Sequence, residues 1–241
     1  MIYNYGLGCL NQNIIKFYPT VKEPENHWKL QETSGSIVYD YCGGVTLTNS
    51  NATVGQTGNI ANAYSFNGSN SKCYANLTAN MKASSVGTFT AWANLGTTAN
   101  NTEAILSISK ATENTRLVIR RSSAAETIEV LCQVSGTYQW IIRNSYTLTN
   151  AGWLHIALTQ DGTAPKLYIN GTDITSFDLE TNKAVWINNS AFTMLSLGYT
   201  NANNSEYGFL EGLIEDVRYY NYKLDDYEIN NLYNNGKGLL I

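Results

Sequence analysis

The side chains best suited to bind a ligand are concentrated in one short polar stretch near the end of the chain. It combines two tyrosines with planar amides and one carboxyl group: Tyr199, Asn201, Asn203, Asn204, Glu206 and Tyr207. Tyrosine rings stack on the apolar face of a sugar, while amide and carboxyl groups hydrogen-bond its hydroxyls. We therefore predict these six residues as a glycan-binding site. Two weaker candidate groups lie at 138–140 and around Trp186. For all three groups the alternative is that the aromatic rings pack the core or rim.

Carboxyl groups with a spacing suited to sugar hydrolysis are scarce. Retaining glycosidases need two carboxyl groups about 5–5.5 Å apart, which places them two or four residues apart on one strand. Glu211 and Glu215 have this spacing, with Asp216 on the opposite face. Asp216 and Arg218, two residues apart, are better explained as a structural ion pair. We therefore expect no enzyme activity, and a glycoside hydrolase is the minor alternative.

The histidines and cysteines form no recognisable reactive motif. His27 and His155 are too far apart in sequence to make a metal site by local spacing. His155 alternates with Trp153 and Ala157, so we expect a packed, hydrogen-bonded core histidine. The cysteines are widely spaced without a Cys-x-x-Cys pair: Cys9, Cys42, Cys73 and Cys132. Free, mostly buried thiols are expected, with one disulfide as the alternative.

Composition limits the classes of partner. Of 241 residues, 43% are hydrophobic and 14% charged, and the formal net charge is −4. Because phosphate binding requires a basic face, we expect no nucleic acid partner. No segment approaches the ~18 consecutive apolar residues of a membrane helix. Residues 1–19 lack the basic start and apolar centre of a signal peptide, so an extracellular location would be reached by another route.

A central antiparallel hairpin is the clearest element that could position these residues. Residues 153–159 alternate with a period of two, which places Leu154, Ile156 and Leu158 on one face. A Gly- and Pro-containing turn follows, and residues 166–169 form the return strand. Asn170-Gly171 then fits a type I′ turn. Because one hairpin is marginally stable in water, a second sheet must cover it.

Further short apolar segments follow one another at about the ten-residue spacing typical of sandwiches. We expect strands at 28–30, 38–40, 46–48, 63–66, 89–93, 105–108, 116–120, 128–132, 138–142, 192–199 and 212–220, with a polar loop from 49 to 58. One helix is expected after Asp225, a good N-cap, with Glu228 completing a capping box. The predicted fold is all-β: a two-sheet antiparallel β-sandwich of the jelly-roll type with one short C-terminal helix.

Several of these blocks, in this order, resemble one known family. They are residues 28–30, 34–35, 38–40, 58–59 and 63–70, the strand that ends at Trp92, the hairpin of 153–171, and the block 209–229. Together they make the chain similar to the laminin-G-like, concanavalin A-like lectin and glucanase jelly rolls, in the branch common in bacterial and phage surface proteins. The resemblance implies a jelly-roll domain over 26–241 and leaves 1–25 as an N-terminal arm or docking extension.

The resemblance also implies partners and one ion. By analogy with related jelly rolls, Asp40 and Asp216 are the candidate ligands for calcium, and no other cofactor is expected. The function implied is a non-enzymatic binding module on a phage virion (capsid decoration, head fibre or tail) that attaches to host cell-surface glycan. Residues 1–25 would contact other virion proteins, and homo-oligomers are common among such fibres. A purely structural virion protein without a glycan site is the alternative.

Overall fold

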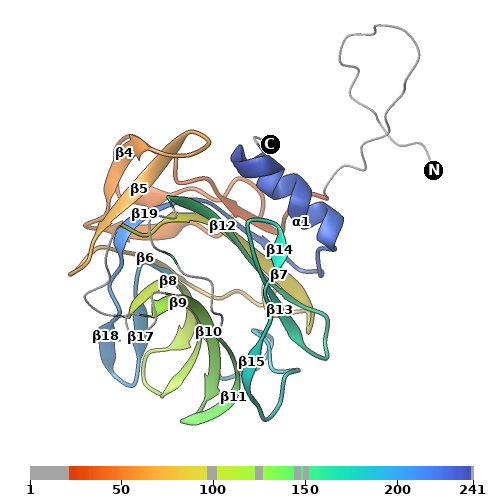
Figure 1. Ribbon diagram of the computed structural model, residues 1–241. Coiled ribbons are helices and arrows are strands. Elements are labelled where there is room, and N and C mark those ends of the chain that lie inside the picture. The colour runs from red at the N-terminus through yellow and green to blue at the C-terminus, as the bar shows by residue number, and fades with distance from the viewer. Residues whose placement is uncertain (1–21, 97–101, 123–126, 144–147, 149–151, 240–241) are drawn as a thin grey trace, which may run out of the picture.

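Alternation of apolar and polar residues along the strands produces two antiparallel sheets that face each other (Figure 1). The computed structural model describes residues 22–96, 102–122, 127–143, 148 and 152–239. The sheet that carries the helix, called here the helix-side sheet, has the order β14-β13-β12-β7-β19-β5-β4, with β1 paired to β19. The other, called the hairpin-side sheet, has the order β15-β11-β10-β9-β8-β16-β6-β3-β2. The predicted two-sheet antiparallel sandwich is confirmed.

Most strand bounds lie close to the predicted segments, whereas β6, β14 and β15 have no predicted counterpart. The helix-side sheet contains β1 (Asn26–Trp28), β4 (Thr53–Thr57), β5 (Asn62–Asn67), β7 (Gly87–Asn94), β12 (Trp153–Gln160), β13 (Pro165–Ile169), β14 (Thr172–Asp173) and β19 (Glu211–Tyr220). The hairpin-side sheet contains β2 (Ile37–Val38), β3 (Leu47–Ser50), β6 (Lys72–Asn76), β8 (Glu103–Lys110), β9 (Thr115–Ser122), β10 (Thr127–Val134), β11 (Thr137–Arg143), β15 (Phe177–Glu180) and β16 (Met194–Leu197).

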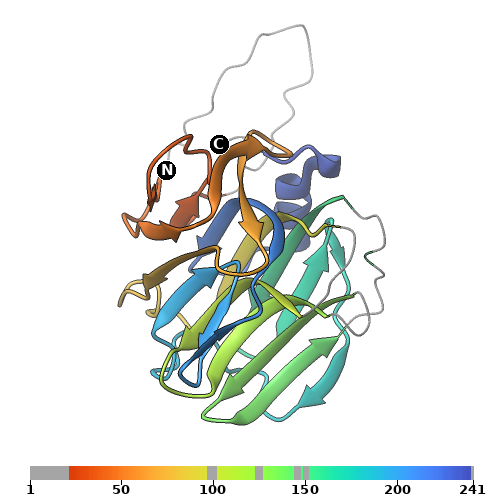
Figure 2. The same cartoon turned by 90° about the vertical axis from the view of Figure 1, so that its left-hand side faces the viewer.

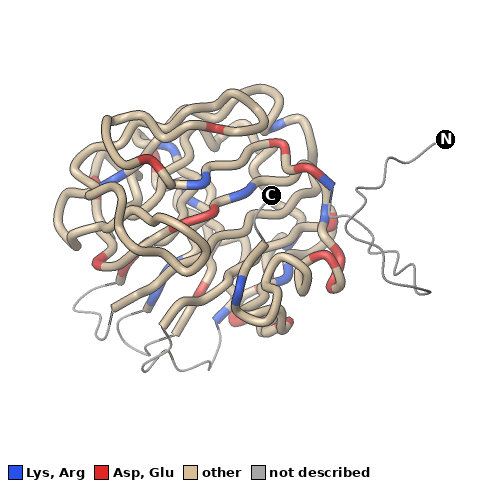
Figure 3. Tube along the Cα trace, turned by 90° about the horizontal axis from the view of Figure 1, so that it is seen from above, with Lys and Arg blue, Asp and Glu red and all other residues tan. Residues whose placement is uncertain are grey.

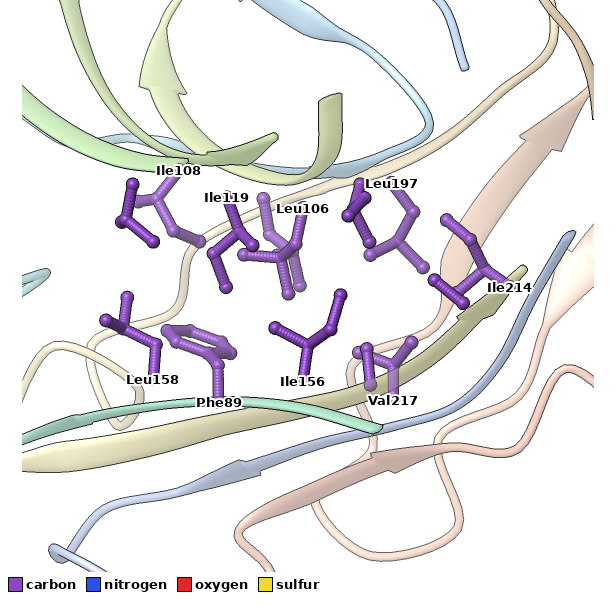
Figure 4. Packing of buried hydrophobic residues seen from close by; sticks show 14 of the residues in the cluster. Phe89, Leu106, Ile108, Ile119, Ile156, Leu158, Leu197, Ile214 and Val217 are labelled. Carbon is purple, nitrogen blue, oxygen red and sulfur yellow. The ribbon is translucent and has the colours of Figure 1, made fainter. Parts of the chain in front are cut away.

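The core lies between the inner faces of the two sheets (Figure 4). The predicted inward set Leu154, Ile156 and Leu158 of β12 is buried there. Figure 4 shows Phe89, Ile156 and Leu158 on one side of the core, opposite Ile108 and Ile119 on the other. Each such side chain contributes about 1.5–3 kcal/mol through removal of apolar surface from water. This packing fixes which faces of the strands point outward, and therefore which residues can meet a ligand.

The predicted central hairpin is confirmed in register and turn. β12 and β13 are antiparallel, and Ile156 pairs with Ile169. Asn170 and Gly171 have φ angles of 51° and 78°, the two positive values that a type I′ turn requires. β12 also pairs with β7. The hairpin therefore lies well inside the helix-side sheet and is not an edge of it.

The C-terminal helix α1 (Asp226–Tyr233) begins as the sequence predicts. The Asp225 side chain accepts a hydrogen bond from the Glu228 backbone N–H, and the Glu228 side chain accepts one from the Asp225 N–H. The helix ends where Asn234 takes a left-handed conformation, and a short 3₁₀ turn η1 (Asn234–Gly236) follows. Ile229 and Leu232 are buried against the outer face of the helix-side sheet (Figure 1).

Two local predictions were wrong. Residues 53–57 were predicted as part of a loop, but they form β4 beside β5. β4 is an edge strand whose side chains are exposed or half-buried in turn. Its sequence therefore lacks the alternation of apolar and polar residues that predicts a strand. The predicted strand 28–30 already ends at Trp28, because Leu30 adopts a positive φ of 56°.

Residues 22–25 lie against the loop that follows β19. The Asn221 amide donates to Glu25 Oε2 at 3.1 Å, and the Lys22 ammonium lies 4.8 Å from the centroid of the Tyr222 ring. Residues 1–21, which include Cys9 and most of the predicted arm, lie outside the described residues. Among the described cysteines, Cys73 and Cys132 are buried free thiols, and Cys42 is exposed and free.

Charged residues of both signs are interspersed over the surface rather than segregated in the view of Figure 3. In the part of the chain that the structure describes, no helix has the length and apolar character needed to cross a bilayer.

Candidate functional site

The predicted glycan-binding stretch forms a small two-stranded hairpin outside both main sheets. β17 (Thr200–Ala202) pairs with β18 (Ser205–Tyr207). Asn203 and Asn204 take φ angles of 55° and 57°, so they form a type I′ turn in which asparagine tolerates the left-handed conformation. We call this element the β17–β18 hairpin.

The β17–β18 hairpin is held against the outer face of the hairpin-side sheet. The Asn203 backbone N–H donates to the Glu113 carbonyl at 2.9 Å, and the Asn204 N–H to the Ala111 carbonyl at 2.6 Å. β17 also contacts β8 and β9. Figure 2, which turns this side of the molecule toward the viewer, shows the hairpin in blue in front of the yellow-green strands. Its tip is therefore fixed relative to the sandwich.

The tip presents the predicted amides and carboxyl group to solvent. Asn203, Asn204 and Glu206 are exposed, and Asn201 is half-buried. The Glu206 carboxylate accepts two hydrogen bonds from the Lys72 ammonium, at 2.5 and 2.7 Å. The two turn amides keep donors and acceptors available for sugar hydroxyls.

Tyr199 packs inside the protein, which was the alternative to glycan stacking for the aromatic residues. It is 1% exposed, and its ring stacks on Phe209 with centroids 5.8 Å apart and an interplanar angle of 12°. The Lys72 ammonium lies 5.3 Å from the ring centroid. No face of Tyr199 is therefore free to stack on a sugar. Trp140 and Trp186 of the two weaker aromatic groups are likewise fully buried in the core.

Tyr207, the last residue of β18, is the partly exposed aromatic ring of the predicted set. Its hydroxyl accepts a hydrogen bond from Arg116 Nη1 at 2.7 Å. The same nitrogen donates to Asn114 Oδ1 at 2.9 Å. Arg116 and Tyr207 border a small cavity of about 40 Å³ between the hairpin and the sheet, lined also by Thr102, Ala104, Val118, Arg120, Thr200 and Gly208.

The sequence reasoning missed Arg116 and Arg120 as site residues. Both belong to the predicted strand 116–120, and with Val118 they occupy its outward positions because Leu117 and Ile119 face the core. The Arg-x-Val-x-Arg alternation was a sufficient signal that two guanidinium groups share an outer face. Only the position of the hairpin, which depends on long-range contacts, showed that they border the predicted site.

The other charged groups on this outer face are paired. Arg120 binds Glu129 at 2.5 Å, and Glu129 also binds Arg143 at 3.0 Å. Arg143 extends the chain of ion pairs to Asp178. These pairs join β9, β10, β11 and β15 side by side across the sheet.

Asp40, one predicted calcium ligand, holds a loop through hydrogen bonds. Its two carboxylate oxygens accept from the Asn26 side chain and from four backbone N–H groups, those of His27, Cys42, Gly43 and Val45. Burial acts to raise the pKa of Asp40, but these donors outweigh it and hold the pKa below its usual range. Calcium takes six to eight oxygen ligands. A shell of five N–H donors does not fit that requirement.

Asp216, the second predicted ligand, is also surrounded by nitrogen donors. It accepts from His27 Nε2 at 2.7 Å and from Arg218 Nε at 3.0 Å, so the predicted ion pair with Arg218 is confirmed. Burial acts to raise the pKa of Asp216, but Arg218 and His27 together keep it below its usual range. Asp216 lies at a bulge in β19 with a φ of 52°. Among the described residues, no group of three or more His, Cys, Asp or Glu is placed to hold a metal ion.

The carboxyl pair considered for hydrolysis separates into two different environments. Glu215 is buried and accepts hydrogen bonds from the backbone N–H groups of Asn59, Ile60 and Ala61. Burial raises the pKa of Glu215 against the opposing effect of these donors. Glu211 lies exposed at the start of β19. Glu215 therefore fastens the loop before β5 to the sheet, which is a structural role.

His155 is packed in the interior on the opposite side of the molecule, under α1. It is 1% exposed, with its ring centroid 5.2 Å from that of Trp92 and 6.3 Å from that of Tyr233. The predicted packing is confirmed, but Nδ1 has no hydrogen-bond partner within the described residues. Burial lowers the pKa of His155 to about 4. It is therefore neutral at pH 7 and remote from the β17–β18 hairpin.

The two-sheet fold is that of one class of protein, the concanavalin A-like sandwiches. The family model for the concanavalin A-like lectin/glucanases superfamily matches residues 66–230, more than half of the chain, and the protein belongs to this family. The match agrees with the resemblance noted in the sequence. No curated protein sequence matches the chain.

Solved structures share the fold at low sequence identity. A Trypanosoma rangeli sialidase in complex with sialic acid aligns with 15% identity and a TM-score of 0.63, over 86% of this chain and 32% of that one. The CBM40 of a Ruminococcus gnavus IT-sialidase, bound to alpha2,3 sialyllactose, aligns with 21% identity and a TM-score of 0.53, over 63% of this chain and 84% of that one. A protein described as the HCR/D W1238A mutant aligns with 19% identity and a TM-score of 0.62, over 88% of this chain and 52% of that one. The chain thus spans about a third of the sialidase.

Proposed function

We propose that the protein is a non-enzymatic carbohydrate-binding module whose binding surface is the β17–β18 hairpin and the cavity beside it. The observation that carries the proposal is the arrangement at the hairpin. The exposed amides of Asn203 and Asn204 lie in one fixed turn, and the half-exposed ring of Tyr207 borders a cavity at its base. This combination of planar amides and one aromatic ring suits sugar hydroxyls and a sugar face. The sialyllactose complex of the CBM40 neighbour supports a sugar as the ligand class.

The proposal of binding without catalysis is supported by the uses of the carboxyl groups. Glu215 and Asp216 are each engaged by several N–H donors, and Glu215 is enclosed under the loop of 59–61. A general acid or nucleophile would have to give up these hydrogen bonds to reach a glycosidic oxygen. Incubation with a polysaccharide panel and a reducing-end assay should give no product above the buffer control. Release of reducing ends by the wild type above the buffer control would contradict it.

The binding proposal is tested with two tyrosine variants on opposite sides of the molecule. Tyr207→Ala removes the ring at the hairpin, whereas Tyr227→Ala removes a ring that is 45% exposed on α1. On a glycan array, we expect Tyr207→Ala to lose about tenfold in apparent affinity, the scale of one lost aromatic contact. Asn203→Gly keeps the left-handed turn and removes the amide, and we expect a smaller loss. Equal binding by Tyr207→Ala and Tyr227→Ala would place the sugar site elsewhere.

The biological setting that we propose is a phage virion surface, with a glycan of the host cell as the ligand. A weakly charged surface of interspersed signs and membership of a lectin-type family support this setting. The arm of residues 1–25 is the proposed attachment to other virion proteins. A chain that lacks residues 1–25 should keep its glycan binding but lose incorporation into particles. Unchanged incorporation of this variant would contradict the attachment role.

A second candidate function, a purely structural virion protein, is favoured by one surface stripe. Ile37, Tyr39 and Tyr41 alternate along the edge strand β2 and the segment after it, and they are 47%, 54% and 55% exposed. An exposed apolar edge is a common protein-docking surface. If Tyr39→Ser with Tyr41→Ser abolishes particle incorporation and the glycan array shows no binding by the wild type, the structural function replaces the glycan-binding one.

A further inference from the structure

Among the residues that the structure describes, Arg116 differs from the other arginines of the hairpin-side sheet in having no carboxylate partner. Arg120 and Arg143 share Glu129, and Arg121 lies 3.7 Å from Glu103. Within the described residues, both side-chain hydrogen bonds of Arg116 go to neutral oxygens, those of Asn114 and Tyr207. A positive charge therefore lies at the base of the β17–β18 hairpin without a carboxylate counter-ion from the described part of the chain.

The free part of the Arg116 guanidinium has the geometry of an anion receptor. Both hydrogen bonds leave from Nη1, and Nε is buried with no partner in the described part of the chain. A guanidinium presents parallel N–H groups that bind a carboxylate through two hydrogen bonds at once. Leaving a buried donor unpaired is unfavourable, which favours a ligand that supplies an acceptor at this position.

The cavity next to Arg116 is the right size for a carboxylate and too small for a sugar ring. Its volume is about 40 Å³, and one water occupies roughly 10–15 Å³ measured in this way. A group of three heavy atoms therefore fits, and a pyranose ring must remain outside, against Tyr207 and the hairpin amides. Val118 and Ala104 give the cavity an apolar wall, and their cluster with Leu131 is buried. An apolar wall strengthens the attraction between opposite charges.

We infer that the β17–β18 site binds acidic sugars, with the sugar carboxylate seated in the cavity on Arg116. The ligand class comprises glycans that contain uronic acid or a nonulosonic acid such as sialic acid. The ring lies against Tyr207, and its hydroxyls meet the amides of Asn203 and Asn204. This inference rests on the proposed glycan-binding function and names the chemical class that it selects. Arg120 on the same cavity adds positive potential, although Glu129 neutralises it in part.

The experiment compares each acidic glycan with its carboxyl-reduced counterpart, in which the carboxylate has become a neutral alcohol. The probes are 3′-sialyllactose, polygalacturonate oligomers, their reduced forms, and dextran sulfate as a sulfated control. Because the carboxylate supplies a charge-assisted bidentate contact, we expect reduction to weaken binding by about tenfold or more. This comparison uses the unmodified protein, so it does not depend on the folding of any variant.

The protein variants then assign the effect to Arg116. We expect Arg116→Gln to remove the preference for the acidic member of each pair, and Arg116→Lys to retain a weakened preference because the charge stays and the bidentate fork is lost. Arg143→Gln is the matched control, since Arg143 lies on the same sheet face but has two acidic partners. It should leave the preference unchanged.

The outcomes separate the inference from the proposed function. Binding that is equal for acidic and reduced glycans, or an Arg116→Gln protein that keeps the preference, overturns the acidic-sugar inference and leaves the binding function standing. Stronger binding of dextran sulfate than of any carboxylated probe also overturns it. Binding to none of these probes overturns the inference, and binding to no glycan on the array as well overturns both. An acidic preference that is lost in Arg116→Gln and kept in Arg143→Gln supports both.

Discussion

The outer faces of the two sheets are built from strands with the same alternating pattern, yet the two faces are covered differently. On the helix-side sheet, α1 covers Ala157, Tyr168 and Tyr220, and the face becomes a second small core. On the hairpin-side sheet, a hairpin covers only one region and leaves ion pairs and a cavity beside it. The difference shows that the covering element, rather than the strand pattern, decides whether an outer face is closed into a core or keeps polar groups and a cavity.

The aromatic and cationic groups on the two faces differ as well. Under α1 and the turn that follows it, Trp92, His155 and Tyr233 pack ring against ring, and His155 is held neutral. Under the β17–β18 hairpin, Arg116 remains charged beside Tyr207. We therefore expect changes on the helix side to reduce stability and changes on the hairpin side to reduce binding.

The largest expected effect is the loss of Trp92 on the helix side. Trp92 is 1% exposed, and its removal in Trp92→Ala leaves a large cavity under the end of α1, with an expected cost of about 3–5 kcal/mol in the free energy of unfolding. Denaturant unfolding followed by circular dichroism measures it. The control Tyr227→Ala, on the exposed face of α1, should stay within about 0.5 kcal/mol. A loss below about 1 kcal/mol for Trp92→Ala would mean that this face is not a core.

The next effect is a pH dependence that originates at His155. Its pKa is about 4 in the folded chain and 6.5 ordinarily, so the unfolded chain takes up the proton first as the pH falls. Stability is therefore lost as the pH falls from about 6.5 to about 4, by about 3 kcal/mol in total. The measurement is the free energy of unfolding across this window for the wild type and for His155→Phe.

Subtracting the pH profile of His155→Phe from that of the wild type isolates the contribution of His155 from that of carboxyl groups. Glu215, for example, has a raised pKa and therefore adds stability as the pH falls, which is the opposite direction. The His155→Phe protein should lack the loss of stability that protonation of the imidazole causes in the wild type. Parallel pH profiles of the two proteins would show that the imidazole is already accessible to protons in the folded chain.

A smaller effect on the helix side comes from the N-cap. Asp225→Ala removes the side-chain acceptor of the Glu228 N–H and should reduce stability by about 1 kcal/mol. Asp225→Asn retains an acceptor and should recover most of the loss. Glycan binding should be unchanged in both proteins, because α1 is remote from the β17–β18 hairpin. A change in binding equal to that of Tyr207→Ala would undo the separation of roles between the two faces.

The smallest effect is expected from an ion pair on the hairpin side. Arg143 has a side chain that is 49% exposed and contacts Glu129 and Asp178. The Glu129 side chain is buried but keeps Arg120 as a partner when Arg143 is removed. Because Arg143 itself is half exposed, Arg143→Gln should change the free energy of unfolding by less than about 1 kcal/mol. Thermal unfolding at low and high salt measures it. A loss above about 2 kcal/mol would show that these ion pairs support the sheet as strongly as the aromatic cluster supports the helix side.

The elements that the sequence predicted well are those fixed by local patterns. The inward set of β12, the Asn170-Gly171 turn and the Asp225 cap each depend on residues close together in the chain. β4 escaped prediction because an edge strand needs no buried side chains. Asp40 and Asp216 were predicted as ion ligands from their residue type and from the resemblance alone. The hydrogen-bond donors that surround them come from distant segments, or from backbone N–H groups that only the folded chain brings together.

The candidate site was predictable in composition but not in arrangement. The polar stretch of 199–207 was recognised from its residue types, and its turn follows from the Asn-Asn pair. The burial of Tyr199 depends on packing against Phe209 and against Lys72 and Tyr74 of β6. The position of Arg116 at the site depends on the docking of the hairpin onto β8 and β9, which brings Arg116 beside Tyr207, 91 positions away. Such contacts leave no local pattern in a single sequence.

The central claim, that the hairpin side recognises the ligand and the helix side does not, is tested most directly by mapping a bound glycan with NMR. The best-binding glycan of the array is titrated into the isotope-labelled protein, and backbone amide shifts are followed. We expect the largest shifts in Thr200–Tyr207 and around Arg116, with none in Asp226–Tyr233. Shifts concentrated in α1 or along the Ile37–Tyr41 stripe, with the β17–β18 hairpin unchanged, would contradict the account.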